Sequence, residues 1–212
     1  MKLKVVDVKT YFDADNKRPK VCNINPGYTC LVGPNGSGKT TLLKQIRIFC
    51  EKNSYKYEYM HYDNLHDGGF RAAGNYVNMN RVSTAATLLS SSEGEGILIN
   101  LGSFAGKCGE AAKRCSVNGK SLVILIDGFD SGTSIDKIYD FRKYLINTIL
   151  ESCKRDGTEV YIISTANNYA MVDESVDCIN AHTRKHRTFK SYNSFKKFVI
   201  DLAKTLDDES ED

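Results

Sequence analysis

Hydrophobic and polar residues alternate near the N-terminus in the period of a β-strand. Leu3 and Val5 start this pattern, and Val21, Ile24 and residues 28–32 continue it after a polar segment. A Pro-Gly turn precedes the last run. The opening of the chain therefore predicts a β-meander that leads into a buried strand.

Beyond this opening, runs typical of strands alternate with helical repeats. Apolar residues recur at helical spacing within residues 42–50, 83–89, 97–108, 135–153 and 195–202. Runs rich in β-branched and aromatic residues predict strands at residues 55–62, 122–126, 160–163, 176–180 and 188–189. Residues 64–74 are predicted to form a loop. The alternation indicates an α/β fold with a mostly parallel central sheet flanked by helices.

The composition is that of one soluble globular domain. The 212 residues are 41% hydrophobic and 26% charged, with a net charge of +3, so bulk charge does not predict nucleic-acid binding. We assign residues 1–205 to a single domain and residues 206–212 to an acidic, disordered tail.

Two features predict a cytoplasmic protein without a membrane partner. The longest apolar run, residues 122–126, is far shorter than the roughly 20 residues that span a bilayer, and no signal-peptide core follows Met1. The seven cysteines are odd in number and form no C-x-x-C pair. They are expected to be small buried thiols in a reducing cytosol.

The clearest functional signal is the octapeptide GPNGSGKT, which fits the P-loop pattern G-x-x-x-x-G-K-[ST] at every position. It stands between a predicted strand and a predicted helix, so backbone N–H groups and the helix N-terminus can surround phosphate oxygens. The predicted phosphate-binding residues are Gly33, Pro34, Asn35, Gly36, Ser37, Gly38, Lys39, Thr40 and Thr41. Lys39 is expected to reach the β- and γ-phosphates of a nucleoside triphosphate, and the Thr40 hydroxyl to bind Mg²⁺.

Three motifs in family order resemble those of ABC-type ATPases, especially the SMC/RecF-like branch. Residues 26–43 are similar to the Walker A region, and Ser92 to Glu95 (SEGE) to the signature motif. Residues 126–136 are similar to a Walker B end that runs into a D-loop. The resemblance implies a P-loop NTPase fold, ATP as the ligand, and Asp127 as a second Mg²⁺ ligand.

The resemblance also implies a homodimer that forms on ATP binding. In that family the signature of one subunit closes on the γ-phosphate held by the other, which assigns Ser92, Gly94 and Glu95 to ATP binding. One chain carries one half of each site, so a two-fold dimer completes both. The alternative interpretation of this segment is an ordinary capping box before a helix.

Three polar groups that the ABC-type pattern expects near the γ-phosphate are missing. Gly128 stands in place of the general-base Glu, Ala166 in place of the switch His, and Gln45 lies inside the Walker A helix. Lys39, Asp127 and Asp130 are the catalytic candidates, although Asp130 also suits a purely hydrogen-bonding role. Asp63 or Asn64 is offered as a contact to Mg²⁺ or water, and Asn167 as a contact to the γ-phosphate.

These observations predict an ATPase with weak hydrolysis that acts on DNA or on a DNA-handling partner. The alternative is an ATP-gated switch or scaffold without significant turnover, and Gly128 favours it because a positioned base contributes typically 10²- to 10⁴-fold. A transporter subunit is disfavoured because no coupling subdomain is evident. Basic residues 184–187 could contact phosphates, and Tyr11 or Phe12 could stack on adenine.

Overall fold

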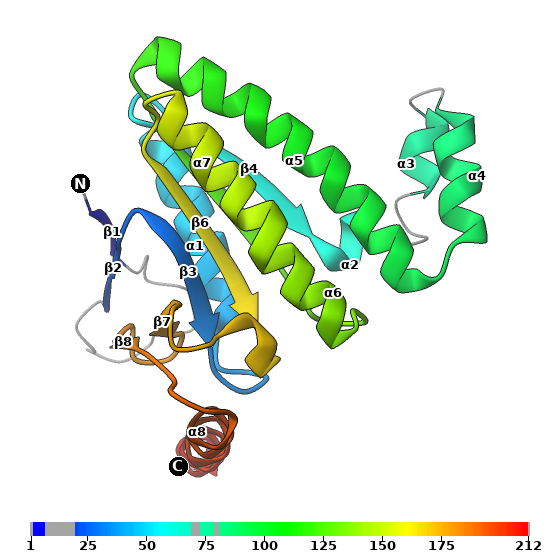
Figure 1. Cartoon of the computed structure of the whole chain (residues 1–212). Coiled ribbons are helices and arrows are strands. Elements are labelled where there is room, and N and C mark those ends of the chain that lie inside the picture. The colour runs from blue at the N-terminus through cyan, green and yellow to red at the C-terminus, as the bar shows by residue number, and fades with distance from the viewer. Residues whose placement is uncertain (1, 7–19, 69–72, 79–80, 212) are drawn as a thin grey trace.

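A six-stranded sheet forms the centre of the computed structural model, which describes residues 2–6, 20–68, 73–78 and 81–211 (Figure 1). Its strand order is β4-β5-β6-β3-β7-β8, and neighbours are parallel except for the antiparallel pair β7 and β8. The strands are β3 (Gly27–Val32), β4 (Tyr57–Asp63), β5 (Ser121–Asp127), β6 (Val160–Ala166), β7 (Asp177–Asn180) and β8 (His186–Arg187). The predicted α/β fold with a mostly parallel sheet is confirmed.

The order of the strands gathers loops from distant segments at one edge of the sheet. From β3 the chain passes through α1 (Lys39–Lys52) to the edge strand β4, and it returns through β5 and β6 to lie beside β3. β7 then pairs with the other side of β3. Such a reversal of direction opens a crevice at the carboxyl ends of parallel strands.

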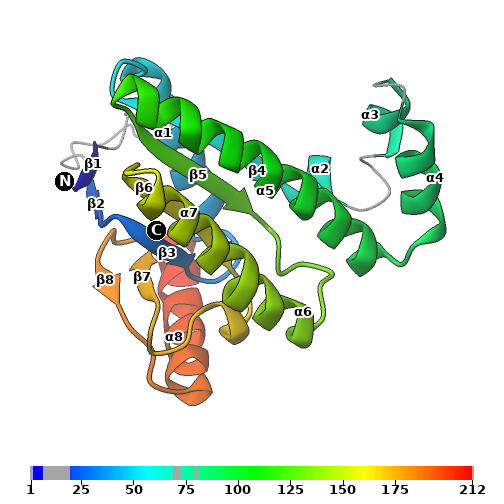
Figure 2. The same cartoon turned by 45° about the horizontal axis from the view of Figure 1, so that its top comes forward.

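Both faces of the sheet are buried under helices. Because side chains alternate along a strand, Leu122, Ile124 and Ile126 join one core cluster, whereas Val123 and Leu125 join the other. One face is covered by helix α1, and the other by helices that lie in front of the sheet in Figures 1 and 2. These helices are α5 (Glu93–Asn118), α6 (Ile135–Asp140), the π-helical segment η2 (Phe141–Ile146) and α7 (Asn147–Arg155). The helix predicted over residues 135–153 therefore forms with a π-helical middle.

The predicted N-terminal β-meander is wrong at its last step. β1 (Leu3–Val6) and β2 (Val21–Ile24) pair antiparallel in a separate two-stranded sheet, whereas β3 pairs with β6 and β7 in the central sheet. The residues from Cys30 to Val32 are fully buried, which a strand covered on both faces requires. Tyr11 and Phe12, the candidates for adenine stacking, lie outside the described residues.

The segment predicted as a loop at residues 64–74 contains helical turns. It forms α2 (Asn64–Asp67) and the start of α3 (Ala73–Asn78). The Asp63 carboxylate caps α2 by accepting a hydrogen bond from the Leu65 N–H. So short a helix has no apolar repeat to predict it. The helix predicted at residues 83–89 is confirmed as α4 (Val82–Ser90), which lies with α3 beyond the start of α5 in Figures 1 and 2.

The C-terminal segment differs from the prediction in two places. The last strand lies at β8 instead of residues 188–189, because Phe189 turns into the core against Phe195 and Phe198. Helix α8 (Tyr192–Glu211) continues through most of the predicted disordered tail. Its apolar anchors at residues 195–202 start the helix, and each further residue then adds a backbone hydrogen bond without a new nucleation step.

All seven cysteines are buried and outside any disulfide, as the sequence predicts. Burial raises the pKa of six of them, all but Cys22, for example to about 12 for Cys108, so these six thiols stay protonated at neutral pH. Within the described ranges, no helix combines the length and the apolarity that crossing a membrane requires.

Because helices cover both faces of the sheet, we expect the stability of the protein to depend strongly on the central strands. Ile162 of β6 is fully buried between β3 and β5. We expect Ile162→Ala to lower the free energy of unfolding by about 2–5 kcal/mol because it leaves a cavity. The control is Val117→Ala at the exposed end of α5, where the change should stay within about 0.5 kcal/mol. Equal urea unfolding midpoints for both variants would contradict this account.

Candidate functional site

The loop from Gly33 to Thr40 curls between β3 and α1, and glycine is required at two of its turns. A Cβ atom on Gly33 would lie 2.4 Å from the Ser37 Oγ, so no other residue fits there. Gly38 precedes α1 with a φ of +88°, in the left-handed region that favours glycine. The loop is closed by a hydrogen bond of 3.2 Å from the Ser37 N–H to the Pro34 carbonyl.

Lys39 lies folded along this loop. Its Nζ donates hydrogen bonds to the carbonyl oxygens of Gly33 (2.7 Å) and Pro34 (3.0 Å), and the side chain is buried. Burial lowers the pKa of Lys39, while the charges of Asp130 and Asp127 oppose that shift. A cation is therefore held at the mouth of the loop, in position to meet an incoming anion.

The start of α1 offers groups that the described residues do not satisfy. No described side chain caps this helix, and its first turn carries no acidic residue. The Ser37 Oγ is buried without a hydrogen-bond partner. Free N–H groups at a helix N-terminus attract phosphate, and an unpaired buried hydroxyl is costly unless a ligand pairs with it. These features fit the phosphates of a nucleotide.

A cleft of about 860 Å³ opens in front of the loop. It is bounded by the start of α1, by the carboxyl ends of β4, β5 and β6, and by Ile97 of α5. Of the residues predicted to bind phosphate or Mg²⁺, those that line it are Asn35, Gly36, Gly38, Lys39, Thr40, Thr41 and Asp127, together with the further candidates Asp63, Asn64 and Asn167. A lysine, a hydroxyl and a carboxylate thus meet in one cavity, which is the donor set that a Mg²⁺-bound triphosphate needs.

The Asp127 carboxylate is fixed by Thr165, a residue that the sequence analysis did not select. The buried Thr165 hydroxyl donates to Asp127 Oδ1 and accepts from the Gly128 N–H, both at 2.8 Å. Thr165 lies near the end of β6, next to β5 in the sheet. A polar residue at the carboxyl end of a buried strand was the available signal.

Asp130 has the hydrogen-bonding arrangement that the sequence analysis offered as its alternative to catalysis. Its carboxylate accepts from the N–H groups of Asn167 (2.5 Å) and Asn168 (2.7 Å) and from the Asn167 amide (3.1 Å). Asp130 is buried and is not among the residues that line the cleft, whereas Asn167 is. Asp130 therefore positions Asn167 at the cleft.

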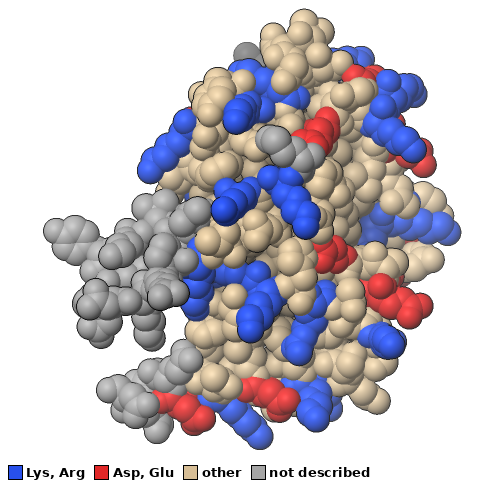
Figure 3. Space-filling model, turned by 90° about the vertical axis from the view of Figure 1, so that its left-hand side faces the viewer, with Lys and Arg blue, Asp and Glu red and all other residues tan. Residues whose placement is uncertain are grey.

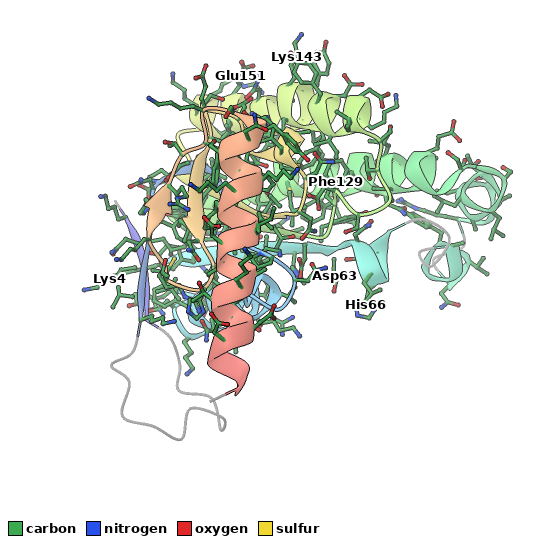
Figure 4. All side chains as sticks on the ribbon, turned by 90° about the horizontal axis from the view of Figure 1, so that it is seen from below. Lys4, Asp63, His66, Phe129, Lys143 and Glu151 are labelled. Carbon is green, nitrogen blue, oxygen red and sulfur yellow. The ribbon has the colours of Figure 1, made fainter. Side chains whose placement is uncertain are left out.

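Asp63 brings a second carboxylate to the cleft. It is the register partner of Asp127 on the adjacent parallel strand, which places the two backbones about 4.8 Å apart. Figure 4 shows Asp63 where β4 ends and His66 on α2, with 3.8 Å between Asp63 Oδ2 and His66 Nε2. Among the described residues that line the cleft, Asp63 and Asp127 are the two acids.

Asn64, the other candidate at this position, is used to join two loops. Its amide donates to the Ser131 carbonyl at 3.0 Å, and its Oδ1 accepts from the Tyr62 hydroxyl at 3.3 Å. Asn64 therefore holds the loop after β5 against α2. The Asn64 side chain thus makes two hydrogen bonds to described residues, whereas the Asp63 carboxylate accepts one.

The segment similar to an ABC signature forms a capping box at the start of α5. The Glu95 N–H donates to Ser92 Oγ at 3.4 Å, and the Ser92 N–H donates to Glu95 Oε2 at 2.9 Å. The alternative interpretation of this segment is thus present in the structure. Neither residue lines the cleft of its own chain, and a Cβ on Gly94 would lie 3.7 Å from the Gly132 carbonyl.

Gly128 has a conformational role besides leaving the site without a glutamate. Its backbone φ is +67°, in the left-handed region that favours glycine. The sequence alone predicts that Gly128→Glu restores a base and raises turnover. We instead expect Gly128→Glu and Gly128→Ala each to lower the free energy of unfolding by about 1–2 kcal/mol, because other residues are strained in the left-handed region.

Gly128→Asn is the matched variant, since Asn tolerates this conformation and should cost less. Thermal unfolding of the three variants ranks them, and phosphate release measures any gain in turnover. A glutamate variant of wild-type stability whose turnover rises a hundredfold would show that Gly128 is a missing base and nothing more.

Comparisons with solved structures find distant similarities. The Aeropyrum pernix ORC2 protein (ADPNP–ADP complexes) superposes with a TM-score of 0.35 at 13% identity, over 72% of this chain and 37% of that one. Cdc6p from Pyrobaculum aerophilum gives a TM-score of 0.31 at 17% identity, over 68% and 33%. The present chain thus spans little more than a third of their lengths. No curated protein sequence matches it.

A family model matches residues 29–187, from within β3 to the end of β8. Its description is "ATPase family associated with various cellular activities (AAA)". The P-loop class predicted from the glycine-rich loop is confirmed, whereas the comparisons give no support to the ABC-type, SMC/RecF-like branch. The chain belongs to the AAA family of ATPases.

Proposed function

We propose that the cleft binds ATP with Mg²⁺, that hydrolysis is slow, and that the bound nucleotide controls what the protein contacts. The observation that carries this proposal is the meeting of Lys39, Thr40 and Asp127 at the uncapped start of α1. The family to which the chain belongs is one of ATPases. A switch or scaffold without significant turnover is the alternative outcome.

Each of these side chains has a distinct part in binding. Thr40 and Asp127 would hold the Mg²⁺, with the Asp127 carboxylate kept in place by Thr165. Lys39 would exchange its bonds to the loop carbonyls for the β- and γ-phosphates. When bound, Mg²⁺ supplies neutralisation of the charge that develops on the phosphate oxygens. The remaining need is a group that orients the attacking water.

Asp63 is the residue that we assign to this water. If Asp127 holds the metal, Asp63 is the remaining carboxylate among the described residues that line the cleft. One of its oxygens already accepts the Leu65 N–H at 2.9 Å, and the other lies 3.8 Å from His66 Nε2, too far for a hydrogen bond, so this second oxygen can accept from water. A short side chain that also caps a helix is a poorer base than a free glutamate, so we expect slow turnover.

Asp63→Asn tests this assignment. Asparagine caps helices as well as aspartate does, so the free energy of unfolding should change by less than about 1 kcal/mol. An amide cannot take a proton from water, so steady-state phosphate release should fall at least tenfold, while ATP affinity is kept. Glu51→Gln on α1, exposed and outside the cleft, is the matched control.

The Lys39→Ala variant gives the background rate of phosphate release. If wild type and Asp63→Asn release phosphate at the same rate above that background, the role of Asp63 is refuted. No release by wild type above that background, with ATP still bound, would favour the switch without turnover.

The homodimer belongs to the same proposal. It rests on the resemblance of Ser92 to Glu95 to a signature motif, and the exposure of Ser92 leaves it accessible to a second chain. Specific activity that rises with protein concentration is the expected sign of sites completed between two subunits. Activity independent of concentration, from a protein that light scattering shows to be monomeric with ATP, would refute the dimer.

A basic face supports the proposal that the protein contacts DNA or a DNA-handling partner. Figure 3 shows Lys and Arg side chains gathered on the face that carries β1, β2 and β8. Hydrogen bonds from Lys20 to the His182 carbonyl (2.6 Å) and between His186 and the Asn23 carbonyl (2.7 Å) hold β2 beside the β7–β8 turn. The exposed basic residues on these elements and next to them are Lys2, Lys4, Lys20, Lys185, Arg187 and Lys190.

Salt-dependent binding of a labelled 20-base-pair duplex, followed by fluorescence anisotropy, tests this face. A variant with Lys4, Lys185 and Lys190 changed to Gln should reduce the slope of log affinity against log salt by about 2–3 units, because each phosphate contact contributes about 0.9. The control carries the same change at Lys113, Lys143 and Lys154, which lie on the helices of the other side. Equal slopes for both variants, or no binding by wild type at low salt, would refute DNA contact through this face.

A further inference from the structure

A second cavity, of about 500 Å³, lies outside the nucleotide cleft. It is bounded by β4, by Asp67 of α2, by Tyr76 of α3, by Arg81 just before α4, and by the middle of α5. None of the residues that line it also lines the cleft. Its volume falls within the range typical of small-molecule sites.

Asn100 is the feature of this cavity that needs a ligand. It lies on α5, lines the cavity and is 5% exposed, yet neither its Nδ2 nor its Oδ1 has a hydrogen-bond partner. A buried amide without partners is destabilising, and an apolar residue of the same size would suit the fold better. Both polar atoms are themselves buried, so the amide has to turn toward the cavity before its donor and acceptor, which lie side by side, can pair with a ligand.

The walls and the mouth of the cavity add two further preferences. Tyr62 and Phe104 pack with ring centroids 5.6 Å apart, and Tyr76 adds a half-buried ring, so the walls suit a planar ligand. Arg81 and Lys107 line the cavity while being exposed, so they stand at its mouth and favour an anionic group.

Two other titratable groups line the cavity, and of these only the Asp67 carboxylate carries a charge that opposes an anion, against the two cations at the mouth. Burial lowers the pKa of His61, which is therefore largely neutral at pH 7. The Asp67 carboxylate accepts the Asp63 N–H at 2.9 Å, which directs it toward the backbone of the β4–α2 junction.

We propose that this cavity is a second ligand site that takes an adenine mononucleotide, distinct from the ATP of the cleft. The amide of Asn100 would pair with the adenine edge, where a donor lies next to an acceptor, as asparagine does when it reads adenine in DNA. The aromatic side chains would contact the base, and Arg81 and Lys107 the phosphate.

Hydrogen bonds connect residues that line this site to residues that line the cleft. Asp67 binds the backbone of Asp63, and the Tyr62 hydroxyl binds Asn64, while both Asp63 and Asn64 line the cleft. A mononucleotide in the second cavity therefore contacts the segment that positions the water-orienting carboxylate.

Calorimetric titration with AMP tests the site, both with the free protein and with the protein saturated by a non-hydrolysable ATP analogue. We expect one saturable AMP site that persists when the analogue is present. Asn100→Leu should weaken AMP binding at least tenfold and raise the melting temperature, because it removes an unpaired buried amide. Lys113→Gln, on the exposed side of α5, should change neither.

Arg81→Gln distinguishes the two ends of the ligand, since it should weaken the binding of AMP and leave that of adenosine unchanged. Lack of saturable AMP binding at millimolar concentration, loss of binding in the presence of the analogue, or unchanged binding by Asn100→Leu would each overturn the proposal. Binding of AMP by a protein that fails to bind ATP would refute the function proposed for the cleft and leave this site standing.

Discussion

The proposed function depends on one feature of the molecule. No described side chain caps the first turn of α1, so the backbone N–H groups of that turn would bind an anion. The glycine-rich loop before this helix turns through the left-handed residues Gly36 and Gly38. Lys39, folded against the carbonyls of Gly33 and Pro34, keeps a positive charge in place meanwhile. A triphosphate would satisfy the helix, the loop and the lysine together.

In the function that we propose, the carboxylates opposite that loop set the rate at which a bound nucleotide is hydrolysed. Thr165 ties Asp127 to the backbone of Gly128, which has a left-handed conformation. No glutamate stands among the described residues that line the cleft. The acid that remains, Asp63, arrives from the neighbouring strand and is partly used as a helix cap. Binding is thus well supported, and fast chemistry is not.

The features that could be predicted from the sequence are those formed by residues close together along the chain. The phosphate loop is a contiguous octapeptide, and the apolar periods of its flanking strand and helix are clear, so loop, strand and helix are where the pattern predicted them. The pairing of Asp63 with Asp127 depends instead on the register of two strands separated by α2 to α5. The hydrogen bonds of Thr165 and the burial of the unpaired Asn100 amide are likewise set by packing between distant segments. Helix α8 extends into the segment predicted to be a disordered tail, because a helix anchored upstream continues through charged residues that carry no apolar period.

The central claim is that this cleft holds ATP through the P-loop lysine. Equilibrium titration of the full chain with Mg-ATP, compared with Lys39→Ala, tests it most directly. We predict saturable binding by the wild type and an affinity at least a hundredfold lower in the variant, with an unchanged circular dichroism spectrum. Equal affinity for Mg-ATP in a folded Lys39→Ala protein would contradict the account.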